Sequence, residues 1–475
     1  MTTYYTSTVR FLGRTARRRS RCCFLGSSTF RTASSKAALP TAGITTNNQT
    51  VAPRQFPMTG FRALPCEVKI EEERLEHYVA GDFYPVTIGD VFQSRYQVVA
   101  KLGFGSASTV WLAKDLTDPR RTNEYRTLKV CTATKEGSVV AQQAATELAV
   151  SKHLRSKSVV DEIAKHPGRR TIRTVLGSFT IANEGNHNNT HQCLLYAPAG
   201  MSFGEFRDIL PEGVFDKRML QHSVQLLLFG LDYLHRCEVV HTDISPNNVL
   251  LGVQDAHILH QVEEDEVARP MARKRYGDDD NRTVYVSRPI PITSGNPILS
   301  DLGSARFGQA SYQGDIMPWV YRAPEVILGM TWSSKVDIWS IGMMMWDLFE
   351  HRRLVRARDA QDNPSDEHHL AELVGLLGPP QPELVRRSPA CKQYWDADGN
   401  WIAATPIPDG SLDARETRLA GEDKALFVAM LRRVLRWLPE ERPPADELAY
   451  DDFLMQAYFA SRAAQGATSA AMTVE

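Results

Sequence analysis

Three short polar runs, far apart but in a fixed order, constrain this chain more than any other feature. The first is His241-Thr-Asp-Ile-Ser-Pro-Asn-Asn248, where Asp243 stands five residues before Asn248 on a stretch stiffened by proline. Asp301-Leu-Gly303 and Ala323-Pro-Glu325 follow downstream. Carboxylate and amide oxygens are ligands that Mg²⁺ accepts in proteins. The order therefore indicates chemistry on a metal-bound substrate, which a hydrophobic stripe would not.

The bulk composition is that of an ordinary globular protein. The chain has 475 residues, enough for one large or two ordinary domains, and 43% of them are hydrophobic and 23% charged. It contains no run of eighteen apolar residues, so we expect no membrane-spanning helix. The seven cysteines are scattered, which indicates reduced, buried thiols in place of a disulfide framework.

The first 65 residues differ from the rest. They contain no Asp or Glu, and they carry nine Arg and Lys36 together with many Ser and Thr. An Arg-rich, Ser-rich and acid-free leader is typical of a mitochondrial transit peptide. A disordered basic tail, or a start site assigned too far upstream, would explain the same composition. We therefore expect the fold to exclude residues 1–65.

The hydrophobic pattern predicts an α+β fold in two lobes. Short apolar and β-branched runs predict strands at residues 96–102, 110–113, 126–130 and 190–196, with an Ala-rich helix over 141–154. Helical spacing dominates afterwards, over residues 219–235, 335–350 and 424–437. We expect a small strand-rich lobe over 66–200, a larger mainly helical lobe over 201–458, and a frayed tail over 459–475.

A charged segment interrupts the larger lobe at about residues 255–297. It carries the runs Glu263-Glu-Asp-Glu266, Arg273-Lys-Arg275 and Asp278-Asp-Asp280. Charge runs of this kind are typical of a solvated loop. A docking or regulatory role is the alternative.

A glycine-rich turn offers a cover for phosphate groups. Gly103-Phe-Gly-Ser-Ala-Ser-Thr-Val110 lies between two predicted strands and fits G-x-G-x-x-G-x-V, except that Ser108 replaces the third glycine. Without side chains, Gly103 and Gly105 would let the backbone, with Ser106, approach phosphate oxygens. Val110 would pack on a base. Tight hairpin turns show the same pattern, so the turn alone is a weak signal.

Two charged residues would anchor the phosphates. Lys129 lies in a predicted strand, where a lysine is most often an exposed edge charge. Glu147 follows on a predicted helix and could otherwise belong to a solvated face. In this context we expect Glu147 to hold the Lys129 ammonium toward the α- and β-phosphates.

The polar runs supply the remaining parts of a phosphoryl-transfer site. Asp243 would act as the base that orients the substrate hydroxyl, and Asn248 and Asp301 would bind Mg²⁺. Glu325 is expected to pair with Arg442. Asp337 is expected to accept N–H bonds from the catalytic loop, unless it only caps its own helix.

With these residues in place, the chain resembles the eukaryotic protein kinase fold over roughly residues 90–458, and more narrowly the SR-protein kinase family. The residues that carry the resemblance are Tyr84–Asp90, Lys101–Gly103, Ser108–Leu112, His241–Ile244, Asp301–Gly303 and His369–Gly378, with the spacer at 255–297. The resemblance implies a monomeric Ser/Thr kinase that uses ATP and Mg²⁺.

Further expectations follow from the family. The substrate would be protein, the family's own acceptors being Ser in the Arg-Ser repeats of splicing factors, and no direct nucleic-acid binding is expected. Tyr196, Ala197 and Ala199 would form the adenine-binding hinge. Thr242 replaces an Arg that receives an activation-loop phosphate in other kinases, so activity would not wait for that phosphate. The family is found in cytoplasm and nucleus, whereas the leader points to mitochondria.

Two departures weaken the transfer of function. Ser245 stands where the family has a catalytic lysine. Residues 351–358 are basic close to where the family carries an acidic substrate groove, although Asp359, Asp362, Asp366 and Glu367 partly restore acidity. A pseudokinase that serves as a nucleotide-binding scaffold is therefore a second hypothesis, which rests on Ser245 and Ser108. A small-molecule kinase is a third, which the Ala323–Glu325 run and the Asp337 helix disfavour.

Overall fold

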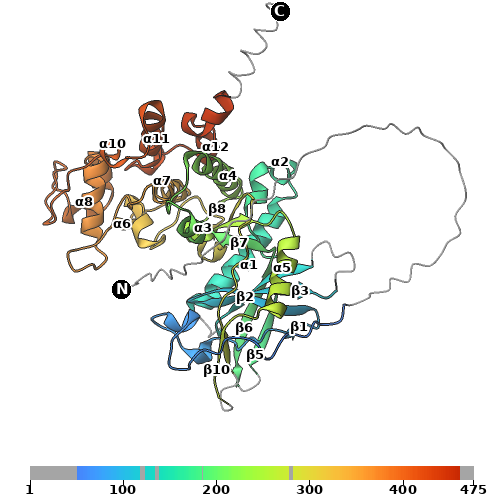
Figure 1. The fold of residues 1–475 in the computed structure, drawn as a ribbon. Coiled ribbons are helices and arrows are strands. Elements are labelled where there is room, and N and C mark those ends of the chain that lie inside the picture. Colours follow the sequence, from blue (N-terminus) through green and yellow to red (C-terminus); the bar gives the residue numbers. More distant parts are fainter. Residues whose placement is uncertain (1–50, 118–123, 134–137, 184–185, 278–281, 461–475) are drawn as a thin grey trace, which may run out of the picture.

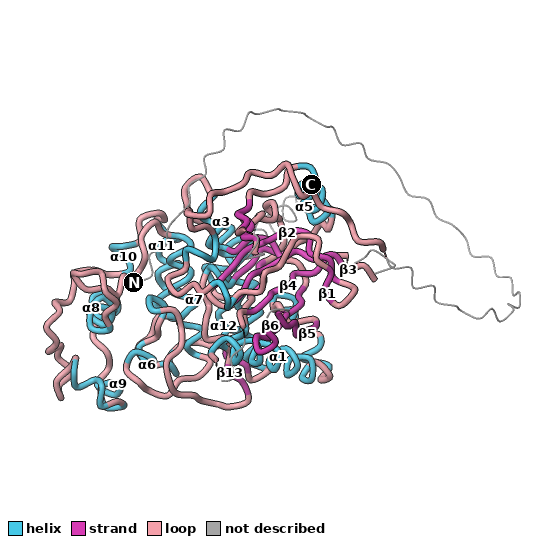
Figure 2. The backbone as a smooth tube through the Cα atoms, turned by 90° about the horizontal axis from the view of Figure 1, so that it is seen from below, coloured by secondary structure: helices cyan, strands magenta, loops and turns pink. Residues whose placement is uncertain are grey.

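The protein folds into two lobes, one rich in strands and one mainly helical (Figures 1 and 2). The structure is a computed structural model, and it describes residues 51–117, 124–133, 138–183, 186–277 and 282–460. The leader expected at 1–65 lies outside the described residues up to residue 50, as does the tail from 461 onward. Within the described residues, no helix combines the length and the apolar character needed to cross a bilayer.

The small lobe is built on one antiparallel sheet of six strands in the order β1-β2-β3-β4-β6-β5. Its bounds are β1 Val91–Phe92, β2 Tyr96–Gly105, β3 Ser108–Asp115, β4 Tyr125–Cys131, β5 Gly177–Asn183 and β6 Asn186–Tyr196. Helix α1 spans Val139–Lys157 and is followed by the short α2 at Asp161–Ala164. The four predicted strands and the predicted helix are all present, each slightly longer than its hydrophobic pattern indicated.

The large lobe holds most of the helices, with two small antiparallel sheets on the side of the cleft. The helices are α3 Phe203–Ile209, α4 Lys217–Arg236, α6 Pro324–Ile327, α7 Lys335–Phe349, α8 Asp366–Leu377, α9 Pro382–Arg387, α10 Leu412–Arg415, α11 Gly421–Val434 and α12 Ala445–Leu448. The strands are β7 Ala199–Ser202, β8 Val239–Val240, β9 Val249–Gly252, β12 Pro297–Leu299 and β13 Arg306–Phe307.

Helix α7 is the centre of the large-lobe core. Every residue from Val336 to Phe349 is buried, including the three consecutive methionines Met343–Met345. Helix α4 packs nearby and runs unbroken through Gly230. A side chain there would collide with Thr171, because an added Cβ would lie 2.4 Å from the Thr171 Oγ1 atom. Gly230 therefore serves close packing and does not break the helix.

The charged segment at 255–297 is not a solvated loop, contrary to the expectation from its charge runs. It forms helix α5 (His257–Ala268) and the hairpin β10 (Arg273–Arg275) and β11 (Thr283–Tyr285). Leu259 and Val262 of α5 are buried in one cluster with Val99 and Leu112 of the small lobe. Figure 1 shows α5 beside β2 and β3. The run Asp278–Asp280 lies outside the described residues.

The charges of this segment are paired with parts of the chain far away in sequence. Buried Glu263 accepts hydrogen bonds from Lys114 at 2.9 Å and from Arg54 at 3.3 Å. Buried Glu266 pairs with Arg273 at 3.1 Å and with Arg288 at 2.8 Å. Buried charges persist when they are paired in this way.

The expected boundary at residue 65 is also corrected. Residues 51–65 belong to the folded lobe, since the Val51 N–H donates to the Leu116 carbonyl and Leu64 N–H to the Arg273 carbonyl. Phe56 packs against two hydrophobic clusters of the small lobe. The basic composition of the leader therefore extends into residues 51–65, which are folded and in part held by the 255–297 segment.

Candidate active site

A cleft of about 490 Å³ lies between the lobes and collects most of the predicted site residues. Among these, the cleft lining includes Gly103, Gly105, Val110, Lys129, Glu147, Tyr196, Ala199, Asn248 and Asp301. Four other predicted residues, Ser106, Ala197, Asp243 and Ser245, are not part of that lining among the described residues. Residues from both lobes therefore line one cleft.

The glycine-rich turn connects β2 to β3 above the cleft. Gly105 pairs with Ser108 across the hairpin, so Ser106 lies at its exposed tip. A Cβ added at Gly103 or Gly105 would meet no atom within 4 Å. The two glycines therefore leave open space beside their backbone, as a phosphate cradle requires.

Lys129 is held between two carboxylates. Its Nζ lies 3.1 Å from Glu147 Oε2 and 3.8 Å from Asp301 Oδ1. Burial works against the charged ammonium, but the carboxylates of Asp301 and Glu147 outweigh it and raise the pKa of Lys129. In turn, the Lys129 charge lowers the pKa of Asp301 below its usual range. Both groups are therefore charged at neutral pH.

Strand pairing explains how the first two polar runs meet across the 255–297 segment. β9 follows Asn248 directly, β12 precedes Asp301, and the two strands pair antiparallel with Leu299 opposite Val249. The Ser300 N–H donates to the Asn248 carbonyl at 2.8 Å. The intervening residues leave the sheet and return to it, so their length does not disturb the site.

Asp243 and Asn248 are directly connected. The Asn248 side-chain amide donates to the Asp243 carbonyl and to Asp243 Oδ2, both at 2.8 Å. Burial raises the pKa of Asp243, the positive potential of His241 opposes this, and the charge of Asp301 raises it further. A carboxylate whose pKa is raised in this way binds a proton more readily than one in water.

Asp337 fixes the backbone of the same loop. Its two carboxylate oxygens accept from the N–H groups of His241 at 2.8 Å and Thr242 at 2.9 Å. His235 Nε2 lies 2.9 Å from the same carboxylate. The expectation that Asp337 binds the loop is confirmed. This anchor accompanies a positive φ of 69° at Thr242.

Thr242 has a local partner in the segment after Asp301. Its hydroxyl donates to the Ser304 carbonyl at 2.9 Å. Kinases that carry Arg at this position use it to bind a phosphate. Here a neutral hydrogen bond joins the two loops, and it needs no modification.

Ser245 and the lower-lobe ion pair complete the predicted frame. Ser245 is 8% exposed, and its carbonyl accepts from the Asn248 N–H at 3.0 Å. Arg442 Nη1 and Nη2 lie 2.6 and 2.7 Å from the two Glu325 oxygens, and both residues are buried. The predicted Glu325–Arg442 pair is confirmed, with bidentate geometry.

Arg173 is a cleft residue that the sequence did not reveal. Its guanidinium lies 4.7 Å from the centre of the buried Tyr196 ring and donates to the Ala197 carbonyl at 3.0 and 3.3 Å. Burial lowers the pKa of Arg173. In sequence it follows Arg169-Arg-Thr-Ile, which is typical of a charged surface. Because of the two Arg173 hydrogen bonds, the Ala197 carbonyl of the expected adenine-binding hinge already has a partner.

The side chains of the cleft fit a magnesium-bound nucleoside triphosphate. Asp301 is ionised, its side chain is 47% exposed, and Asn248 adds an amide oxygen. Mg²⁺ prefers a few protein oxygens and takes the remaining ligands from phosphates and water. Lys129 and the open glycine turn match the phosphate charge and bulk.

Comparisons with known proteins agree with this geometry. Residues 96–454 match the model of the protein kinase domain. A serine/threonine protein kinase of Aspergillus fumigatus is 40% identical over 414 residues, which cover 86% of this chain and 96% of the relative. The serine/threonine-protein kinase SRPK of Physarum polycephalum is 26% identical over 79% of this chain and 89% of its own.

Two further comparisons are more limited. The human SRSF protein kinase 3 is 36% identical over 189 residues, 40% of this chain and 31% of that protein. A crystallised kinase domain at 22% identity shares the fold, with a TM-score of 0.55 over 78% of this chain and 99% of that one.

The fold, the cleft and the matched domain model together define a protein kinase, and the chain belongs to that family. The Aspergillus fumigatus and Physarum polycephalum relatives, which match most of the chain, are serine/threonine kinases, and the enzyme is accordingly a protein serine/threonine kinase.

Proposed function

We propose that this protein is a catalytically active kinase that transfers the γ-phosphoryl group of ATP to Ser or Thr of protein substrates. The observation that carries the proposal is the direct connection of Asp243 to Asn248, beside the charged pair of Lys129 and Asp301. Catalysis of this reaction consists mainly of positioning and charge stabilisation. The chain has a residue for each task.

Each residue has a distinct role in the proposed reaction. The Asp243 carboxylate orients the substrate hydroxyl and accepts its proton as the oxygen attacks phosphorus. Lys129, held by Glu147, binds the α- and β-phosphate oxygens. Asn248 and Asp301 would hold Mg²⁺, which supplies positive charge to the β- and γ-phosphates. Gly103, Gly105 and Ser106 would cover the phosphates.

The base would bind at the hinge against Val110 and the Tyr196–Ala199 segment. Arg173 donates two hydrogen bonds to the Ala197 carbonyl, so a base that contacts this carbonyl would compete with the guanidinium for the two lone pairs of the oxygen. Ser245 would take the position of the family's lysine and contribute a neutral hydroxyl there. Losing one charge-stabilising contact costs about 10²–10³ in rate.

That loss favours a second candidate function. A pseudokinase would bind nucleotide in the same cleft and transfer little phosphate, and buried, uncharged Ser245 is the observation that favours it. The intact set of Asp243, Asn248, Asp301 and Lys129 supports the active enzyme as the first candidate.

The substrate class is proposed from relatives. Several are named SRPK or SRSF protein kinases, so Ser in Arg-Ser repeats is the first acceptor to test. The Thr242–Ser304 hydrogen bond supports activity without activation-loop phosphorylation.

The deciding experiment is phosphate transfer from labelled ATP–Mg²⁺ to an Arg-Ser repeat peptide, with the full chain beside Asp243→Asn. Transfer that is lost in the variant supports the active kinase. If a pool of other Ser and Thr peptides also stays unlabelled while ATP binds with Mg²⁺ dependence, the pseudokinase replaces it.

A further inference from the structure

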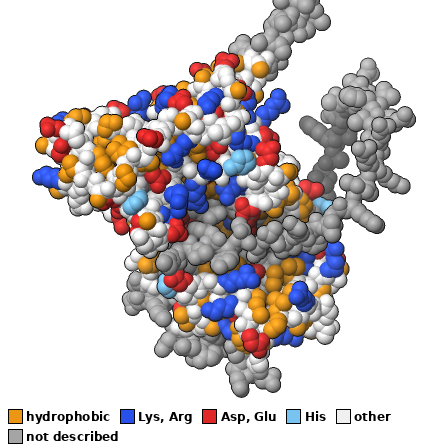
Figure 3. Space-filling view, turned by 60° about the vertical axis from the view of Figure 1, so that its left-hand side comes forward, with side chains coloured by type: hydrophobic (Ala, Val, Ile, Leu, Met, Phe, Trp, Pro, Cys, Tyr) orange, Lys and Arg blue, Asp and Glu red, His pale blue; other side chains and the backbone are white. Residues whose placement is uncertain are grey.

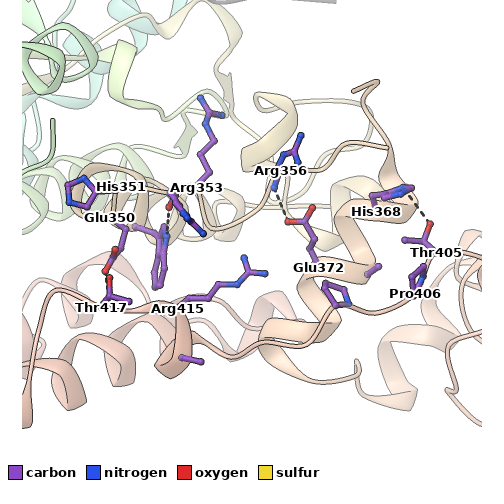
Figure 4. A pocket seen from close by; sticks show the side chains of 15 residues that line it. Glu350, His351, Arg353, Arg356, His368, Glu372, Thr405, Pro406, Arg415 and Thr417 are labelled. Atoms are coloured by element: carbon purple, nitrogen blue, oxygen red, sulfur yellow. Dashed lines mark hydrogen bonds between the residues drawn. The ribbon is translucent and has the colours of Figure 1, made fainter. Parts of the chain in front are cut away.

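The large lobe carries a second cavity, apart from the nucleotide cleft. It has a volume of about 1110 Å³ and lies between the segment that follows α7, helix α8, and the chain around α10 (Figure 4). We call it the basic groove. The groove is lined by Trp346, Glu350, His351, Arg352, Arg353, Arg356, His368, Ala371, Glu372, Thr405, Pro406, Pro408, Ala414, Arg415 and Thr417.

Four of these side chains are guanidinium groups, contributed from opposite walls. Arg352, Arg353 and Arg356 follow α7, whereas Arg415 ends α10 on the other side. Figure 3 shows Lys and Arg side chains gathered on one face of the large lobe. The lining also holds two histidines, His351 and His368.

The two carboxylates in the groove are engaged by the protein itself. Glu372 accepts from the N–H groups of Arg356 at 2.8 Å and Ala357 at 3.2 Å, as Figure 4 shows for Arg356. Glu350 is buried and accepts from the Thr417 N–H at 3.2 Å. These acids order the walls of the groove. The lining therefore holds more guanidinium groups than carboxylates.

The arginines differ in how strongly they are held. Arg415 donates to the Leu354 carbonyl at 2.5 Å, and Arg356 makes one exposed contact with Asp362 at 3.3 Å. Exposed pairs of that kind contribute little and are displaced at low cost. Arg352 and Arg353 are exposed, and within the described parts of the chain neither pairs with a carboxylate.

We propose that the basic groove binds an acidic, Asp- and Glu-rich segment of a protein partner. Guanidinium groups bind carboxylates with two parallel hydrogen bonds, and arginines on both walls could hold successive acidic side chains of an extended peptide. Pro406 and Pro408 supply an apolar surface for its aliphatic parts, and the buried Trp346 and Ala371 lie beneath the groove. An Arg-rich segment would meet like charge here.

The proposal rests on the proposed kinase function. A protein substrate would present an acidic docking segment to the groove, at a distance in sequence from the residue that is phosphorylated. The docking segment and the acceptor serine would then contact different parts of the large lobe. The groove's occupancy itself does not depend on phosphate transfer.

The test measures binding directly, by fluorescence anisotropy with the full chain. The probes are a labelled decapeptide of alternating Asp and Glu, an Arg-Ser repeat peptide of equal length, and a single-stranded RNA decamer. The groove variant is Arg352→Glu with Arg353→Glu. The matched control is Arg386→Glu with Lys392→Glu, which makes the same change in net charge at two exposed positions of the same lobe outside the groove.

We expect the acidic peptide to bind the wild type and the control equally, and the groove variant at least tenfold more weakly. Equal affinity of the groove variant and the wild type would overturn the proposal. So would RNA or the Arg-Ser peptide binding more tightly than the acidic peptide in a manner that the groove variant abolishes. Circular dichroism of each variant separates misfolding from lost contacts.

The same samples separate this inference from the proposed function. If the wild type binds the acidic peptide but transfers no phosphate, the groove proposal is supported and the proposal of an active kinase is rejected. If it transfers phosphate but does not bind the acidic peptide, the active kinase is supported and the groove proposal is rejected.

Discussion

The carboxylate of Asp337 accepts a hydrogen bond of 2.8 Å from the backbone N–H of His241, which lies 96 residues earlier in the chain. The neighbouring Thr242 N–H donates to the other oxygen at 2.9 Å. The catalytic loop is therefore fixed to the start of α7, the helix at the centre of the large-lobe core. This relationship ties the position of Asp243 to the packing of that core.

Asp337→Asn should loosen this attachment without removing any group of the cleft. The variant amide can accept at one atom only, so one loop N–H loses its partner, at a cost of about 1–3 kcal/mol. We expect a lower free energy of unfolding in denaturant and a lower kcat, with ATP affinity unchanged. Exposed Asp452→Asn is the control. An unchanged kcat would show that the loop holds its shape unaided.

Arg442→Met should destabilise the large lobe strongly. The variant leaves Glu325 as an unpaired buried charge, and breaking such a pair costs about 3–5 kcal/mol. The double variant Arg442→Met with Glu325→Leu should recover much of that loss, because no charge is left buried. Denaturant unfolding of the two singles and the double measures the coupling. A double variant as unstable as the sum of the singles would contradict this account.

Arg173→Leu should raise the affinity for ATP several-fold. The substitution frees the Ala197 carbonyl from the two hydrogen bonds of Arg173, which would compete with the base for that oxygen. Titration calorimetry with a non-hydrolysable ATP analogue measures the change, with the exposed Arg170→Leu as control. Weaker binding in Arg173→Leu would instead assign Arg173 a direct contact with the bound nucleotide.

His369 should make the fold sensitive to acid. Burial, aided by Arg322, lowers the pKa of His369 from 6.5 to about 3, and its side chain is fully buried in α8. The unfolded chain therefore binds this proton first, so the free energy of unfolding falls as pH drops from about 6.5 toward 3. The contribution is about 1.4 kcal/mol per pH unit.

His369→Leu should flatten that pH dependence, whereas the exposed His222→Leu should not. Urea unfolding at intervals between pH 7 and pH 4 gives both slopes. Parallel slopes for wild type and His369→Leu would place the acid sensitivity elsewhere.

The sequence predicted those parts of the protein whose pattern is local. Helix α4 follows from apolar spacing, and Asp337 accepts N–H bonds from the catalytic loop, as expected. The first two polar runs predicted that Asn248 and Asp301 lie together at the cleft, and Glu325 of the third run pairs with Arg442 as expected. Ser106 was expected beside the phosphates, but it lies at the exposed tip of the hairpin and is not part of the cleft lining among the described residues.

The parts that the sequence did not predict depend on distant partners. Glu263 reads as part of a solvated acidic run, yet it is buried because Lys114 lies 149 residues away in sequence and 2.9 Å away in space. Arg54 sits in a basic leader and is held by the same carboxylate. Arg173 is a third case, since its partner is the carbonyl of a hinge residue. No local periodicity reports such pairings.

The segment between β9 and β12 has one more consequence. The main chain passes between the lobes once at Tyr196–Ala199, leaves the large lobe again after β9 to place α5 on the small lobe, and returns at β12. When two lobes are connected only by a hinge, they can rotate apart about it. Here two further crossings lie beside that hinge, since Gly252 at the end of β9 pairs with Ala199. With α5 packed on the small lobe, we expect these crossings to limit how far the lobes open when nucleotide is exchanged.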